Sequence, residues 1–123
     1  MAIKLVALDI DGTLLDSRGN LPPENGCAIK DSVEKGVKVI LVSGRRWSMA
    51  RQVSAALGLS FPVVAHNGAL IRSPIDSHRL ASCFLKPDLA AEILAFSEVH
   101  FSYLVLHRDQ DFMGQTVIHP ACR

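Results

Sequence analysis

The chain has 123 residues, of which 49% are hydrophobic and 20% are charged, and its formal net charge is +1. This composition is typical of a soluble globular protein with a core of its own, and the near-neutral charge argues against nucleic acid as the main partner. No apolar run approaches the roughly 20 residues that a membrane helix needs, so we expect no membrane association.

In the first half of the chain, the predicted strands and helices alternate. We expect strands over residues 3–8, 37–42 and 62–65, because each run is short and mostly apolar. Helices are expected over residues 24–35 and 46–57, each followed by a glycine. This order predicts an α/β fold with a Rossmann-like parallel sheet and helices on both faces.

The character of the sequence changes after a short extra strand expected at residues 69–72. A polar linker follows, and we place a domain boundary between residues 1–75 and 76–123. The second segment is expected to contain a strand, a helix and a strand over residues 80–85, 88–98 and 101–107. This succession predicts an α+β segment distinct from the first domain.

Polar side chains follow each of the three main predicted strands. Asp9 and Asp11 end the first strand, Ser43 follows the second and Asn67 follows the third. Ligands of parallel sheets bind outside the carboxyl ends of the strands, so we expect these side chains to converge at one edge.

The two aspartates raise a question of charge, because like charges two positions apart repel. A divalent cation such as Mg²⁺, which prefers oxygen ligands, would offset that repulsion at Asp9 and Asp11. Either carboxylate is also able to attack phosphorus as a nucleophile, while the other handles protons. The alternative is a turn in which both acids are solvated caps.

The end of the second strand suits an anion. Ser43 offers a hydroxyl, Gly44 offers an accessible backbone N–H, and a helix N-terminus follows near Arg46. The alternatives are that Ser43 is a helix N-cap, that Arg45 is an ordinary surface arginine, and that Asn67 belongs to a common Asn-Gly turn.

Cysteines and histidines show no pattern of a bound metal. Cys27, Cys83 and Cys122 form no CxxC or other close pair, which indicates free thiols in a reducing compartment. The five histidines lack metal-ligand spacing, and we expect them at the surface or in packing contacts. We therefore expect a cytoplasmic protein.

Three segments carry a resemblance to a known family. The sequence DIDGTLL at residues 9–15 resembles the first motif of haloacid dehalogenase-like phosphatases, and LVSGR at residues 41–45 is similar to the second. HNGA at residues 66–69 resembles a segment of the Cof-type branch, in which a large cap follows. The resemblance covers residues 3–72 and implies a family core, here incomplete, followed by the start of an α+β cap.

The resemblance also implies roles for individual residues. Asp9 would be the nucleophile and a Mg²⁺ ligand, and Asp11 would be the general acid/base, giving its backbone carbonyl to the metal. The substrate-binding residues would be Gly12, Ser43, Gly44, Arg45 and Asn67. The implied function is a Mg²⁺-dependent phosphatase that acts on small phosphorylated metabolites through an aspartyl-phosphate intermediate.

The later motifs of that family are missing from the sequence. The family uses a third-motif lysine and a second acidic pair, and no Gly-Asp-x-x-x-Asp segment occurs here. We interpret the chain as an N-terminal half, whether by truncation, by a frameshift or as a fragment. The alternative function is therefore a catalytically inactive fragment that binds phosphate or a partner. Half a sheet also exposes an edge, which predicts a homodimer or a swapped assembly.

Overall fold

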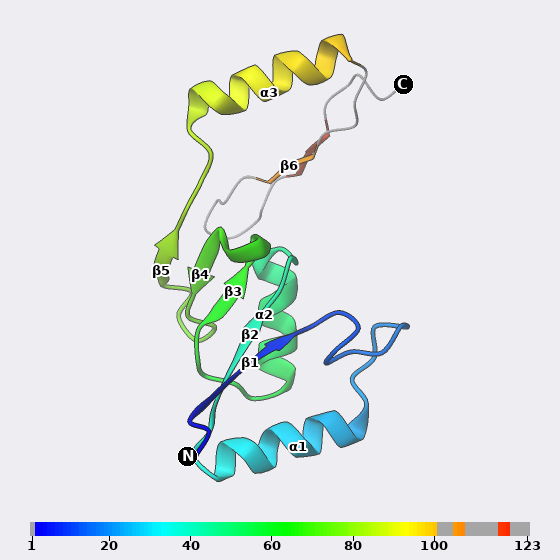
Figure 1. Cartoon of the computed structure of the whole chain (residues 1–123), viewed down its shortest axis with the longest axis vertical. Coiled ribbons are helices and arrows are strands. Elements are labelled where there is room, and N and C mark those ends of the chain that lie inside the picture. The colour runs from blue at the N-terminus through cyan, green and yellow to red at the C-terminus, as the bar shows by residue number, and fades with distance from the viewer. Residues whose placement is uncertain (1, 101–104, 108–115, 119–123) are drawn as a thin grey trace. The chain divides into compact units, whose positions relative to one another are not determined.

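The computed structural model describes residues 2–100, 105–107 and 116–118. It divides the chain into two compact units, Met1–Cys83 and Phe84–Arg123 (Figure 1). The first unit contains the sheet that carries all the predicted site residues. None of the helices in the described ranges is long and apolar enough to span a bilayer.

The first unit is built on a five-stranded sheet whose order follows the chain, β1-β2-β3-β4-β5. Its strands are β1 (Leu5–Asp9), β2 (Lys38–Val42), β3 (Val63–Ala65), β4 (Leu70–Arg72) and β5 (Arg79–Ser82). The first three are parallel, as predicted, and β4 and β5 return antiparallel. The α/β class is therefore confirmed, with a mixed rather than wholly parallel sheet.

The register of β1 and β2 brings the ends of these strands to one edge. Asp9, the last residue of β1, is the partner of Val42, the last residue of β2. The ladder continues into the third strand, because the backbone N–H of Ser43 donates to the carbonyl of Val64 over 2.9 Å. The carboxyl ends of β1, β2 and β3 therefore lie together.

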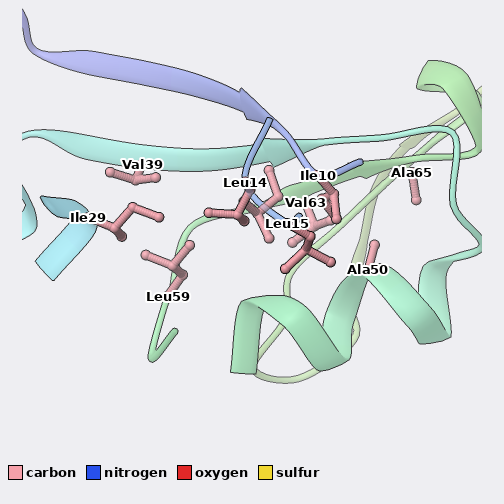
Figure 2. Packing of buried hydrophobic residues seen from close by; sticks show 10 residues of the cluster. Ile10, Leu14, Leu15, Ile29, Val39, Ala50, Leu59, Val63 and Ala65 are labelled. Atoms are coloured by element: carbon pink, nitrogen blue, oxygen red, sulfur yellow. The ribbon is translucent and has the colours of Figure 1, made fainter. Parts of the chain in front are cut away.

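Two helices connect the parallel strands, α1 (Pro23–Glu34) and α2 (Trp47–Ala56). Figure 2 shows Ile29 of α1 and Ala50 of α2 on the same side of the sheet, in one buried cluster with Val39. In the described residues both helices thus lie on one face, whereas the sequence predicted helices on both. The reason is topological: right-handed crossovers between strands that advance in one direction place successive helices on the same side.

The core of the first unit lies between that face and the helices. Val39 and Leu41 of β2 are buried, whereas Ile40 and Val42, which point to the opposite face, are half-buried. On β1 the side chain of Leu5 is 50% exposed. The opposite face and the β1 edge are accordingly the less covered parts of this sheet.

The second unit contains α3 (Pro87–Val99) and a small antiparallel pair, β6 (Val105–His107) and β7 (Thr116–Ile118). Helix α3 begins with a proline in its first turn, where the missing N–H is not needed, and Asp88 lies beside it. The strand expected over residues 101–107 is seen as β6, and the rest of that range lies outside the described residues. Strand β5, expected in the second segment, pairs with β4 of the first unit.

Candidate active site

The two aspartates flank a residue that anchors them. Asp9 and Asp11 are both exposed, whereas Ile10 between them is completely buried in the core. Strand β1 ends at Asp9 and the turn begins at Ile10, so the burial of Ile10 anchors the chain between the two exposed carboxylates. The local sequence, acid-apolar-acid, therefore presents two acids at the strand end.

A tight turn follows the second aspartate. The backbone N–H groups of Leu14 and Leu15 both donate to the carbonyl of Ile10, over 3.2 and 2.9 Å. Both leucine side chains are buried, and Gly12 between them and the acids has φ +74°. Glycine adopts this left-handed conformation without steric cost, so Gly12 lets the chain turn back to the core directly after Asp11.

Backbone hydrogen bonds tie the loop after β2 to the loop after β3. The N–H of His66 donates to the carbonyl of Arg45 over 2.9 Å, and the N–H of Asn67 donates to the carbonyl of Ser43 over 3.2 Å. Ser43 is 3% exposed, and its Oγ accepts the N–H of Arg45 over 3.1 Å. The serine hydroxyl thus still holds its own proton for a second partner.

The N-terminus of α2 has an unexpected cap. The N-cap residue is Arg46, which makes no side-chain capping bond. Instead, the backbone N–H of Trp47 donates to Nε2 of His66 over 3.2 Å. The alternative that Ser43 caps this helix is therefore wrong. His66, expected only at the surface or in packing, fixes the helix that follows residues 43–46, which we call the anion loop. No local sequence signal marks this role, because the two residues are 19 positions apart.

The turn that carries His66 is left-handed over three residues. His66, Asn67 and Gly68 have φ values of +52°, +54° and +92°. The turn places the Asn67 amide over Gly44, where a β-carbon would lie 2.8 Å from Asn67 Oδ1. Gly44 and Asn67, both predicted as site residues, are therefore in contact, and the lack of a side chain at Gly44 is what permits it.

An ion pair joins Asp11 to the anion loop. Arg45 Nη2 lies 2.6 Å from Asp11 Oδ1, and Arg45 Nε donates to Asp11 Oδ2 over 2.9 Å. The side chains are 23% and 59% exposed, respectively. The hydrogen bond from the guanidinium, together with its charge, lowers the pKa of Asp11, and the same contact raises the pKa of Arg45. Arg45 is thus a partner of the predicted general acid/base.

The chemistry of the donor set is compatible with Mg²⁺. The Asp9 carboxylate and the Asp11 backbone carbonyl are hard oxygen donors, and Mg²⁺ commonly takes one or two protein ligands together with water and substrate phosphate. In the part of the chain that the structure describes, no cluster of three or more acidic, histidine or cysteine side chains suits a metal. A cation held here would therefore depend on ligands beyond these two residues.

An apolar groove lies elsewhere on the first unit. It has a volume of about 630 Å³ and runs between α1 and the end of α2, where its lining includes Leu21, Cys27 and Leu57. None of the predicted site residues lines it. The polar edge of the sheet, rather than this groove, gathers the residues suited to phosphoryl chemistry.

Comparison with known proteins decides the family. Residues 6–119 match the model of the haloacid dehalogenase-like hydrolases. The chain belongs to this family. The resemblance found in the sequence, to the N-terminal portion of a Cof-type member, is thereby confirmed.

Individual members of the haloacid dehalogenase-like family match this chain over different lengths. Phosphoglycolate phosphatase of Methanothermobacter thermautotrophicus is 31% identical over 115 residues, which cover 87% of this chain and 52% of the relative. The Bacillus subtilis 5-amino-6-(5-phospho-D-ribitylamino)uracil phosphatase YcsE is 39% identical over 69 residues, which cover 56% of this chain and 28% of the relative. The chain therefore corresponds to about half of the first relative and a smaller part of the second.

Solved structures agree on the fold. A haloacid dehalogenase-like hydrolase from B. subtilis superposes with a TM-score of 0.75 at 29% identity, covering 86% of this chain and 37% of that chain. A further haloacid dehalogenase-like hydrolase, from Bacteroides thetaiotaomicron, has a TM-score of 0.73 at 22% identity, covering 88% of this chain and 41% of that chain. The α/β arrangement is thus that of the family.

Proposed function

We propose that this chain carries the nucleophile and the phosphoryl-binding loop of a Mg²⁺-dependent phosphatase that hydrolyses small phosphorylated metabolites. The observation that supports this most directly is the convergence of Asp9, Asp11 and the Ser43 loop at one sheet edge, in a member of a hydrolase family. The relatives named above are phosphatases of small phosphorylated compounds. We place the substrate of this chain in the same broad class.

Asp9 is proposed as the nucleophile. One of its carboxylate oxygens attacks the phosphorus, and the bond from phosphorus to the leaving oxygen breaks, which gives an aspartyl phosphate and an alcohol. Asp11, which is ionised in its pair with Arg45, takes a proton from solvent once that pair opens and passes the proton to the leaving oxygen. The exposed position of Asp9 at the end of β1 leaves room for this approach.

The second half-reaction returns the enzyme to its starting state. Asp11, now deprotonated, takes a proton from a water molecule as that water attacks the phosphorus. The bond from phosphorus to the Asp9 oxygen breaks, so that inorganic phosphate leaves and the Asp9 carboxylate is restored. Asp11 then gives its proton to solvent as it pairs again with Arg45. The hydroxyl of Ser43 and the backbone N–H groups around Gly12 and Gly44 would donate to the phosphoryl oxygens throughout.

Mg²⁺, held by the Asp9 carboxylate and the Asp11 carbonyl, would supply positive charge that offsets the repulsion between carboxylates and phosphate. We place Arg45 and Asn67 at the rim of the phosphoryl site. Asn67 contacts Gly44 directly, and Arg45 reaches Asp11 across the same edge.

The experiment for this proposal is hydrolysis of 4-nitrophenyl phosphate by the 123-residue chain with and without Mg²⁺. We expect Asp9→Asn to abolish turnover and Asp11→Asn to reduce kcat by about 100-fold or more. Asp31→Asn removes an exposed carboxylate from α1 and is the matched control. Mg²⁺-dependent turnover that survives in Asp9→Asn would contradict the proposed role of Asp9.

A second candidate is a non-catalytic module that binds phosphate. Arg45 engages both oxygens of Asp11, and among the described residues no cluster of three or more acidic, histidine or cysteine side chains suits a metal. Both observations favour binding over turnover. Saturable phosphate binding by the wild-type chain without hydrolysis would select this function.

We also propose that β1 pairs with a second copy of the chain through its free side. In the described sheet β1 is an edge strand, and Ile3 beside it is 72% exposed. We expect a dimer in sedimentation equilibrium that Ile3→Lys and Leu5→Lys weaken. A monomer at all concentrations of the wild-type chain would contradict this.

A further inference from the structure

In its ion pair with Asp11, Arg45 binds the carboxylate of the proposed general acid/base. Arg45 Nε lies 3.2 Å from Oδ1 and 2.9 Å from Oδ2, and Nη2 lies 2.6 Å from Oδ1. Both carboxylate oxygens therefore face the guanidinium. A general acid must direct one oxygen at the leaving group, so Asp11 cannot act in this arrangement until that contact opens.

The surroundings of Arg45 fix its backbone and leave its side chain able to move. Its N–H donates to Ser43 Oγ of the same loop and its carbonyl accepts the N–H of His66 from the loop after β3, so the main chain is held on both sides. The guanidinium and the carboxylate are both partly exposed, and an exposed ion pair is readily exchanged for another. The charged part of the residue is thus the part that is able to change partners.

A phosphoryl group would compete for the same guanidinium. Arg45 is two residues after Ser43, whose hydroxyl is proposed to bind the phosphoryl oxygens. A phosphate dianion carries more charge than a carboxylate, and the planar fork of arginine binds either anion through two hydrogen bonds. An anion at Ser43 would therefore meet Arg45 within one loop.

We propose that Arg45 is a positioning residue that exchanges partners, holding Asp11 in the substrate-free protein and releasing it when the phosphoryl group takes the guanidinium. This inference rests on the proposed function, since it concerns the same phosphoryl site. Binding of the anion and release of Asp11 are then one event. Asp11 becomes free to face the leaving oxygen only when a phosphoryl group is present.

The exchange predicts a coupling between two substitutions that binding measurements detect without turnover. Inorganic phosphate is titrated into the 123-residue chain by calorimetry, with and without Mg²⁺, for the wild type, Arg45→Gln, Asp11→Asn and the double variant. We expect Arg45→Gln to weaken phosphate binding about tenfold, because a charged bidentate contact is lost. Asp11→Asn should tighten it, because the competitor for Arg45 is gone.

The decisive comparison is the effect of Asp11→Asn in the two backgrounds. Exchange predicts that the tightening disappears in the Arg45→Gln background, because no guanidinium remains to be released. An equal tightening in both backgrounds would mean that Asp11 only repels the anion, and it would overturn the proposal. Absence of saturable phosphate binding in the wild type would overturn it too.

Two further variants separate positioning from a structural role. Arg45→Lys keeps the charge without the fork, and we expect it to recover part of the phosphate affinity lost in Arg45→Gln. Arg46→Gln removes the adjacent charge as a matched control and should leave the coupling intact. If Arg45→Gln lowers the melting temperature but leaves phosphate affinity unchanged, the pair is structural and the proposal fails.

These outcomes are distinct from those of the proposed function. A chain that shows the coupling but hydrolyses no 4-nitrophenyl phosphate would support the exchange of partners and contradict the proposed phosphatase activity. Turnover that depends on Asp9, together with additive effects of the Arg45 and Asp11 substitutions on phosphate binding, would support the proposed phosphatase activity and contradict the exchange of partners.

Discussion

The loop after β1 and the loops after β2 and β3 reach the same edge of the sheet by different means. The first closes on itself, through a turn onto the carbonyl of Ile10 and two buried leucines. The other two are joined to each other by backbone hydrogen bonds between Ser43, Arg45 and the residues that follow β3. The acids are thus positioned by burial, and the anion loop by hydrogen bonding across strands.

This difference predicts different responses to substitution. A position held by burial loses stability when its anchor is truncated, because a cavity forms. A position held by hydrogen bonds between loops changes its conformation when one hydrogen-bond partner is removed. Substitutions in the two regions therefore test whether burial or hydrogen bonding positions each loop.

The largest effect is expected at Ile10. Ile10→Ala removes a completely buried side chain between the two acids, and we expect it to lower the free energy of unfolding by about 2–5 kcal/mol. Urea denaturation followed by circular dichroism measures this. Ile75→Ala, at a side chain that is 70% exposed, is the control and should change stability by less than about 0.5 kcal/mol.

A smaller loss is expected at Gly12. Gly12→Ala places a β-carbon at φ +74° with no atom within 4 Å, so the cost is backbone strain rather than a clash. We expect about 1–2 kcal/mol of destabilisation, measured by the same denaturation. Gly26→Ala, inside α1 with an ordinary contact of 3.6 Å, is a helix position without positive φ and should be neutral or stabilising. Equal losses at both glycines would argue against the strained turn.

His66 tests the hydrogen-bonded region. His66→Ala removes the acceptor for the N–H of Trp47, and loss of a helix cap costs about 1 kcal/mol. We expect a lower melting temperature and faster exchange of the Trp47 amide hydrogen, while amides near Ile10 are unaffected. His66→Asn tolerates the positive φ and should lose less than His66→Ala. Unchanged protection of Trp47 in His66→Ala would contradict the capping role.

The smallest effect concerns pH. Backbone N–H groups of Asn20 and Arg18 donate to Asp16 and lower its pKa below the ordinary 3.8. The ionised form is therefore favoured in the folded chain, so this stabilisation is present above pH 3.8 and disappears as pH falls through the lower folded value. Asp16→Asn keeps an acceptor oxygen without the charge.

We expect the melting temperature of the wild type to decrease below about pH 4, and the decrease to be slightly smaller in Asp16→Asn. Differential scanning calorimetry between pH 2 and pH 7 measures the difference. A larger decrease of the melting temperature at low pH in Asp16→Asn than in the wild type would contradict a lowered pKa of Asp16.

Much of the fold followed from the sequence because local patterns determine it. The apolar runs predicted β1, β2 and β3, and the glycines after the helices set their ends within one or two residues. The convergence of the strand ends followed from the rule for parallel sheets. The side on which the helices lie depends on strand order, and no residue within a single element carries that information.

The site was predictable in composition but not in contacts. The motifs selected Asp9, Asp11 and Ser43, whose roles stay predictions, and the Asn67–Gly44 contact joins two further selected residues. The pairing of Arg45 with Asp11 spans 34 positions, and the capping of α2 by His66 spans 19. Such contacts arise only when separate loops meet at the sheet edge.

The ion pair between Asp11 and Arg45 connects the loop after β1 with the loop after β2, and its strength depends on the salt concentration. Both side chains are partly exposed, so mobile ions screen their attraction, over a Debye length of about 8 Å at physiological ionic strength and about 3 Å at 1 M. The hydrogen bonds between the β2 and β3 loops carry no such dependence. Raising the ionic strength should therefore weaken the contact between Asp11 and the anion loop while leaving the anion loop itself assembled.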